Sequence, residues 1–179
     1  MSAEVESAIA ELVHPLRTLR SGARWLDPAN LHLTLRFLGA NVDRKLLVAL
    51  DGMLGKVAAQ TSPFILEARG TGAFPNLDRP RVIWIGLVSQ ELMRLAQQVE
   101  RAATEVGFEP DGRPYSPHLT IARVRDLNGW QRIRRVLHQS SVQGFGSTVI
   151  SEMILYRSIL GGQAPRYHPI ARYTFSRVP

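Results

Sequence analysis

The sequence contains HLTLRFLG from His32 to Gly39 and HLTIARVR from His118 to Arg125. In both stretches polar and aliphatic residues alternate at the start, which predicts a β-strand with one buried face. The histidine and the threonine of each copy would share one face of the strand, while the aliphatic residues pack into the interior. Two copies of this triplet in one short chain predict a single site assembled from two matching halves.

The bulk properties favour an anionic partner. The 179 residues suit one domain or two packed lobes. The net charge is +7, and every basic residue except Lys45 and Lys56 is arginine. Arginine binds phosphate through two parallel hydrogen bonds. The base composition of a GC-rich genome explains the arginine content equally well, so the charge supports a phosphate-bearing ligand without identifying it.

Several classes of protein are disfavoured by the composition. There is no cysteine, which excludes disulfides, thiol nucleophiles and cysteine-based zinc sites. No apolar run approaches the ~20 residues that span a bilayer, so we expect no membrane association. The opening MSAEVESAIAEL is acidic and helical in pattern and lacks the features of a signal peptide. We therefore expect a cytoplasmic protein.

Helical and extended patterns alternate along the chain. Helices are predicted over residues 3–20, 43–60, 89–106 and 127–139. Strands are predicted over residues 23–26, 31–38, 64–70, 81–88, 118–125, 147–160 and 166–175. The turn signal DPAN (27–30), the loop TGAFPNLDRP (71–80) and the connection GGQAP (161–165) separate some of them. Short connections between extended pairs favour antiparallel neighbours, and the loose repetition suggests two similar lobes whose opposed faces bring the motifs together.

The repeated triplet carries groups suited to phosphodiester chemistry. Two histidines can divide the roles of general base and general acid near neutral pH. Two threonine hydroxyls can donate hydrogen bonds to the non-bridging oxygens of a phosphate. Neither motif holds a strong nucleophile or a carboxylate, so we expect neither a covalent intermediate nor a metal site. A strained 2′,3′-cyclic phosphate, which opens more readily than a plain diester, is the substrate that best fits such groups.

A single His-x-Thr triplet most often belongs to a strand without a catalytic role. The presence of two copies is what favours a catalytic role here. The same cleft would also suit a non-catalytic nucleotide- or RNA-binding module. Two acid–base groups argue against that alternative, because binding alone does not need them.

The segments NLHLTLRFLG (30–39) and SPHLTIARVR (116–125) resemble the paired signature of the 2H phosphoesterase superfamily. More closely they resemble the RNA 2′,3′-cyclic phosphodiesterases, historically called 2′-5′ RNA ligases. The flanking segments at 23–41, 74–87 and 154–175 share the resemblance. It implies one α+β domain over residues 1–179, with a bilobal pseudo-twofold fold, an antiparallel sheet backed by helices in each lobe, and an active-site cleft between the lobes.

The resemblance also implies a metal- and cofactor-independent enzyme that opens 2′,3′-cyclic phosphates to 2′-phosphomonoesters. His32 matches the proton donor to the leaving oxygen, and His118 matches the base that activates water. Thr34 and Thr120 match phosphate-binding positions. Arg123 matches a basic residue that assists phosphate binding, although strand alternation puts it on the face opposite His118, so that it would need a bend to take part.

Further expectations concern substrates and assembly. RNA ends or small cyclic nucleotides are the expected substrates, with 2′-5′ ligation as a side activity and a monomer as the assembly state. The short apolar strand that usually opens members of this family is not present before the first predicted helix. Tyr115 and Phe74 are candidates for stacking on a base.

Overall fold

The computed structural model describes residues 1–27, 31–159 and 166–176. By its internal contacts the chain divides into two compact units. The first unit comprises Met1–Thr34, Ile65–Leu92 and Tyr115–Val149, and the second comprises Leu35–Phe64, Met93–Pro114 and Ile150–Pro179. Each unit combines helices with antiparallel strands, so the α+β class expected from the sequence is confirmed.

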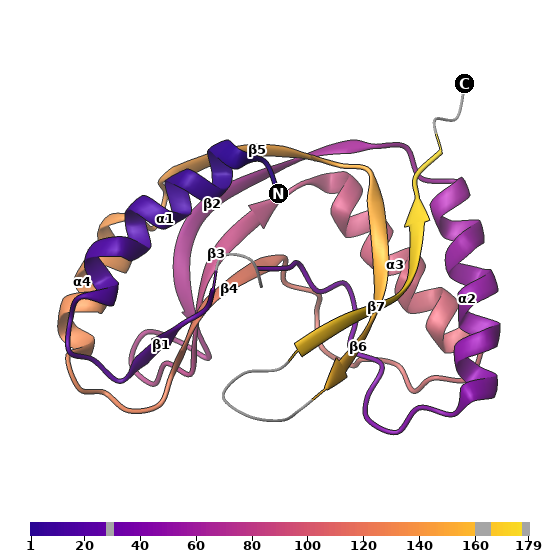
Figure 1. The fold of residues 1–179 in the computed structure, drawn as a ribbon, viewed down its shortest axis with the longest axis horizontal. Coiled ribbons are helices and arrows are strands. Elements are labelled where there is room, and N and C mark those ends of the chain that lie inside the picture. The colour runs from indigo at the N-terminus through magenta and orange to yellow at the C-terminus, as the bar shows by residue number, and fades with distance from the viewer. Residues whose placement is uncertain (28–30, 160–165, 177–179) are drawn as a thin grey trace. The chain divides into compact units, whose positions relative to one another are not determined.

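The first unit is built around a five-stranded sheet with the strand order β1-β4-β3-β2-β5 (Figure 1). The strands are β1 (Ala23–Trp25), β2 (Phe64–Phe74), β3 (Val82–Val88), β4 (His118–Val124) and β5 (Gly144–Ile150). The pairings β1–β4, β4–β3 and β3–β2 are antiparallel. The strand that carries the second motif, β4, therefore has hydrogen-bonded neighbours on both sides.

Two amphipathic helices, α1 (Ala3–Arg17) and α4 (Trp130–Gln139), cover one face of this sheet (Figure 1). Their buried residues recur every three or four positions, as expected for a single apolar stripe: Val5, Ile9, Val13 and Leu16 in α1, and Trp130, Ile133 and Leu137 in α4. The buried Thr71 hydroxyl of β2 donates to the carbonyl of Leu137 at 2.7 Å. Ile121 of β4 lines an apolar pocket of about 210 Å³ with residues of α1. Thr71 and Ile121 therefore mark the helix-covered face.

The second unit contains α2 (Arg44–Ala59), most of α3 (Gln90–Glu105) and a hairpin of β6 (Glu152–Ile159) and β7 (Arg166–Thr174). Phe64 and Phe175 stack within it, with ring centroids 6.1 Å apart. The Tyr173 hydroxyl donates to Asp51, and burial together with this hydrogen bond raises the pKa of Tyr173. Among the helices of the described ranges, none is long and apolar enough to cross a membrane.

All four predicted helices are present, and the differences concern the strands. The predicted loop 71–80 is shorter than expected, because β2 continues to Phe74. Gly72 permits this continuation: a Cβ there would lie 2.3 Å from the Trp84 ring of the neighbouring strand. The predicted strand 147–160 is two strands, β5 and β6, separated at Ser151. The GGQAP connection and most of the DPAN turn lie outside the described residues.

The predicted regular strand over residues 31–38 is wrong. The segment makes one isolated antiparallel bridge, Leu33 to Leu119, and no continuous ladder. Alternating side chains give a segment the pattern of a strand, but a strand forms only where a partner accepts and donates backbone hydrogen bonds over several residues.

Candidate active site

The second motif begins strand β4. Its residues pair with β3 as Gly86 to His118, Ile85 to Leu119 and Trp84 to Thr120. Leu119 is fully buried, whereas His118 and Thr120 are half-buried. The alternation predicted from the sequence therefore holds here: the leucine points to the helix-covered face, and the histidine and threonine point to the opposite face, which we call the motif face.

The first motif lies beside the second through the Leu33–Leu119 bridge. In an antiparallel register centred on this bridge, His32 is opposite Thr120 and Thr34 is opposite His118. Residues directly opposite each other in such a pair share a face, with Cβ atoms about 4.5–5.5 Å apart. If this register holds for one residue on each side of the bridge, the two triplets form crossed histidine–threonine pairs whose four side chains share the motif face.

The motifs meet as neighbours within the first unit, whereas the sequence suggested that opposed faces of two lobes bring them together. Antiparallel pairing of two identical triplets is itself a local twofold arrangement, with the two leucines at its centre. A twofold arrangement puts equivalent residues of the two triplets in equivalent positions. This is consistent with the identical sequence of the two copies.

A bulge in β4 changes the orientation of Arg123. The register passes from Trp84–Thr120 to Ile83–Ala122, so β4 contains one residue more than β3 at this point. Ile121 and Ala122 are consequently both buried, and Arg123 is exposed. Arg123 pairs with Val82, which lies on the same face of β3 as Trp84. The sequence predicts that Arg123 needs a bend to reach the face of His118, and the bulge supplies that bend.

The His118 ring is restrained at two points. Its Nδ1 lies 2.7 Å from the carbonyl oxygen of Ser116. A carbonyl only accepts hydrogen bonds, so Nδ1 carries the proton and Nε2 of the neutral ring is left with a lone pair. The ring of Phe74 meets the imidazole edge-on, with centroids 4.9 Å apart and an interplanar angle of 84°. His118 is thus held in the tautomer that a general base needs.

Tyr115 connects the two motifs. Its hydroxyl donates to the backbone carbonyl of Thr34 at 3.2 Å, and burial raises the pKa of Tyr115. Tyr115 lies three positions before His118. Its side chain therefore links the segment that leads into the second motif with the backbone of the first motif. The two residues considered for base stacking, Tyr115 and Phe74, therefore both contact motif residues.

Trp84 has a specific place on the motif face. It lies directly opposite Thr120, and its ring contacts Phe74 at a centroid distance of 5.3 Å. Its indole Nε1 is buried and has no hydrogen-bond partner among the described residues. The sequence signal that accompanies this packing is the glycine at position 72, since only a residue without a side chain leaves room for the indole.

Candidate metal ligands do not gather anywhere in the described ranges. No group of three or more His, Cys, Asp or Glu side chains there is arranged to hold an ion.

Comparison with known proteins identifies the family. Residues 1–84 and 85–148 match the model described as LigT like Phosphoesterase. The chain belongs to this family. It is 36% identical over 171 residues to a protein of Archaeoglobus fulgidus named RNA 2′,3′-cyclic phosphodiesterase, covering 93% of this chain and 94% of that protein. A protein of the same name from Aeropyrum pernix is 33% identical over 167 residues, 92% of this chain and 89% of the other.

Solved structures show the same LigT-like fold. A protein of Thermus thermophilus superposes with a TM-score of 0.82 at 27% identity, covering 98% of this chain and 93% of that one. Escherichia coli LigT complexed with 3′-AMP superposes with a TM-score of 0.75 at 26% identity, covering 99% of this chain and 94% of that one.

Proposed function

We propose that this LigT-like phosphoesterase hydrolyses the 2′,3′-cyclic phosphate at RNA ends, or in small cyclic nucleotides, to a 2′-phosphomonoester. The observation that carries the proposal is the antiparallel bridge between Leu33 and Leu119, which lays the two His-Leu-Thr triplets side by side. The names of the relatives from Archaeoglobus and Aeropyrum support the same activity.

In the proposed reaction a water oxygen forms a bond to phosphorus while the bond from phosphorus to O3′ breaks. Nε2 of His118 takes a proton from the water, a role that fits the proton fixed on its Nδ1 by the Ser116 carbonyl. His32 donates a proton to O3′ as it leaves. The hydroxyls of Thr34 and Thr120 donate to the non-bridging oxygens, where charge is held in the transition state.

Arg123 assists by binding phosphate from the motif face, which the β4 bulge allows it to reach. The arrangement needs no covalent intermediate, because two acid–base groups on opposite sides of an in-line displacement account for both proton transfers. We propose that the reaction proceeds without a metal ion or cofactor.

The reverse reaction, which joins a 5′-hydroxyl to the cyclic end through a 2′-5′ linkage, uses the same groups. We propose it as a side activity, because water at high concentration competes with the incoming hydroxyl. The cytoplasmic location and the monomeric state expected from the sequence stay predictions.

The test is an assay on a nucleoside 2′,3′-cyclic phosphate in excess chelator. The expected result is complete conversion to the 2′-phosphomonoester, with loss of activity in both His32→Ala and His118→Ala. Tight nucleotide binding without turnover would instead favour the non-catalytic binding module. Full activity in either histidine variant, or a 3′-phosphomonoester as the product, would contradict the proposal.

A further inference from the structure

Two arginines face each other at the far end of the motif face. Strand β1 pairs with β4 so that Arg24 is directly opposite Arg123. Opposed residues in an antiparallel pair share a face and have Cα atoms about 4.5–5.5 Å apart. Because the bulge turns Arg123 to the motif face, Arg24 extends to the same face. Like charges placed opposite each other destabilise a sheet, so this pair does not help the protein to fold.

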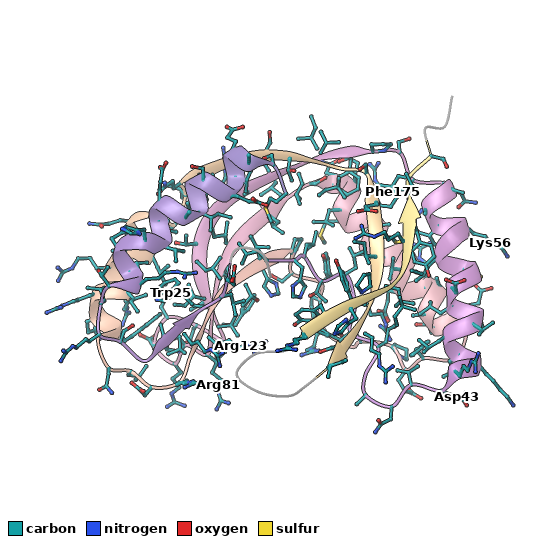
Figure 2. The ribbon with its side chains drawn as sticks, viewed as in Figure 1. Trp25, Asp43, Lys56, Arg81, Arg123 and Phe175 are labelled. Carbon is teal, nitrogen blue, oxygen red and sulfur yellow. The ribbon has the colours of Figure 1, made fainter. Side chains whose placement is uncertain are left out.

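No carboxylate neutralises this pair within the described part of the chain. Arg24 and Arg123 take part in none of the ion pairs formed among the described residues. Arg81 lies at the same end of the sheet (Figure 2), where its carbonyl accepts from the Val124 amide at 2.9 Å. As the neighbour of Val82, however, Arg81 extends to the helix-covered face and is not part of the pair.

The arginine pair lies in line with the proposed reacting groups. Along β4 the motif face presents His118, then Thr120, then Arg123. Three residues of strand at about 3.3 Å each put Arg123 at most about 10 Å beyond Thr120. On the neighbouring strand Arg24 lies opposite Arg123, and the segment that carries His32 bridges to β4 at Leu119. The motif face therefore leads from the proposed site for one phosphate to a pair of arginines that suits a second anion.

We propose that Arg24, which lies beside Arg123, binds the phosphate on the 5′ oxygen of the nucleotide whose cyclic phosphate is opened. The inference rests on the proposed function and narrows its substrate class. The phosphate bound by Arg24 is the internucleotide diester in an RNA end and the terminal monoester in a nucleoside 5′-phosphate. A planar guanidinium suits either one through parallel hydrogen bonds. A nucleoside cyclic phosphate with a free 5′-hydroxyl offers nothing to this site.

The experiment compares four substrates with the same terminal nucleoside 2′,3′-cyclic phosphate. They carry a 5′-hydroxyl, a 5′-monophosphate, a natural dinucleotide linkage, or a dinucleotide linkage made neutral as a methylphosphonate. We expect kcat/KM of the natural dinucleotide to exceed that of the 5′-hydroxyl substrate about tenfold, and the neutral linkage to lose most of that gain. A higher kcat/KM for the natural than for the neutral dinucleotide identifies RNA ends as the substrate class. A higher kcat/KM for the 5′-monophosphate alone identifies a mononucleotide.

Arg24→Gln tests the residue itself. The ratio of kcat/KM between the natural dinucleotide and the 5′-hydroxyl substrate should fall about five- to tenfold, and should stay as in the wild type in the charge-matched control Arg135→Gln on α4. Each phosphate contact on a single strand adds about −0.7 to the slope of log binding constant against log salt concentration. For the dinucleotide, this slope should therefore be less steep in Arg24→Gln than in the wild type. The variant should unfold at the same temperature as the wild type or a higher one, because a like-charge contact is removed.

A binding measurement separates this inference from the proposed function. The dinucleotide that ends in a 2′-phosphomonoester is titrated into wild type and Arg24→Gln. A five- to tenfold weaker Kd in the variant supports the second phosphate site even in a protein that turns nothing over, an outcome that would contradict only the proposed function. Equal Kd values for the two proteins, or equal kcat/KM for all four substrates, would overturn the inference.

Discussion

The two HLT triplets are identical in sequence but differ in the secondary structure and burial of the segments that carry them. The copy at His118–Thr120 begins a strand in the interior of the five-stranded sheet. The copy at His32–Thr34 lies in irregular chain held by one bridge. Leu119 is fully buried, whereas its counterpart Leu33 is only partly buried. Identical chemistry therefore rests on a sheet in one half of the site and on a few individual contacts in the other.

The two triplets are held in position by different contacts. His118 receives its tautomer from the Ser116 carbonyl and its ring orientation from Phe74. The backbone of the first copy receives a hydrogen bond from Tyr115, which belongs to the approach to the second copy. The second motif is thus positioned by its strand, and the first motif is positioned in part by the second.

The largest expected effect is the loss of either histidine. His118→Ala and His32→Ala should each lower kcat about 10²- to 10⁴-fold, the usual contribution of a positioned acid or base. The two variants should differ on an aryl phosphodiester, whose leaving group departs without a proton. Activity on that ester should return largely in His32→Ala and stay low in His118→Ala, as followed by release of the aryl alcohol. Rescue of His118→Ala alone would reverse the assignment of acid and base.

The next effect concerns the two matched leucines. Leu119→Ala leaves a cavity in the core and should lower the free energy of unfolding by about 3 kcal/mol. Leu33→Ala removes a side chain that is already partly exposed and should cost about 1 kcal/mol. Urea unfolding followed by circular dichroism measures both. Equal costs would show that the first motif is as firmly built into the core as the second.

A smaller effect is expected from the tether between the copies. Tyr115→Phe keeps the ring and removes the hydrogen bond to the Thr34 carbonyl, which should cost about 1 kcal/mol of stability. We expect kcat to fall about three- to tenfold with KM changed less, because the tether positions the first motif without contacting the substrate.

The control for the tether is Tyr156→Phe in the hairpin of the second unit, at a tyrosine that lies on neither motif. It should leave kcat unchanged. A Tyr115→Phe enzyme with wild-type kcat and KM would show that the first motif is held without this hydrogen bond.

The smallest effect is a dependence of stability on alkaline pH. Burial raises the pKa of Tyr115, and burial with the hydrogen bond to Asp51 raises the pKa of Tyr173. An unfolded tyrosine releases its proton near pH 10. Above that pH the folded state holds more protons than the unfolded state, so the free energy of unfolding falls as pH rises and is unaffected by these groups below it.

Urea titrations at pH 9 and pH 11 measure this slope. Tyr115→Phe and Tyr173→Phe should each lose less stability between the two pH values than the wild type does. A wild-type slope in both variants would mean that neither hydroxyl is held protonated by the fold.

The sequence predicted the helices well because their apolar residues recur at helical spacing and lie on one face, as in α1. It also predicted which side chains of the second motif share a face, since strand alternation is a local property. It failed at residues 31–38, where the alternation is present but a continuous backbone partner is not. At Arg123 it indicated that a bend is needed but not that one is present, because a bulge depends on the register between two strands.

The sequence by itself determined the chemical groups of the candidate site: two imidazoles and two hydroxyls, each pair on one face of an extended segment, with leucine between them. Only the tertiary structure decided their partners. The bridge between Leu33 and Leu119 lays the two triplets side by side, and the bulge at Ile121 brings Arg123 to the motif face and opposite Arg24. The physical reason is that side-chain alternation is fixed within one strand, whereas the register between strands is fixed only when the backbones pair.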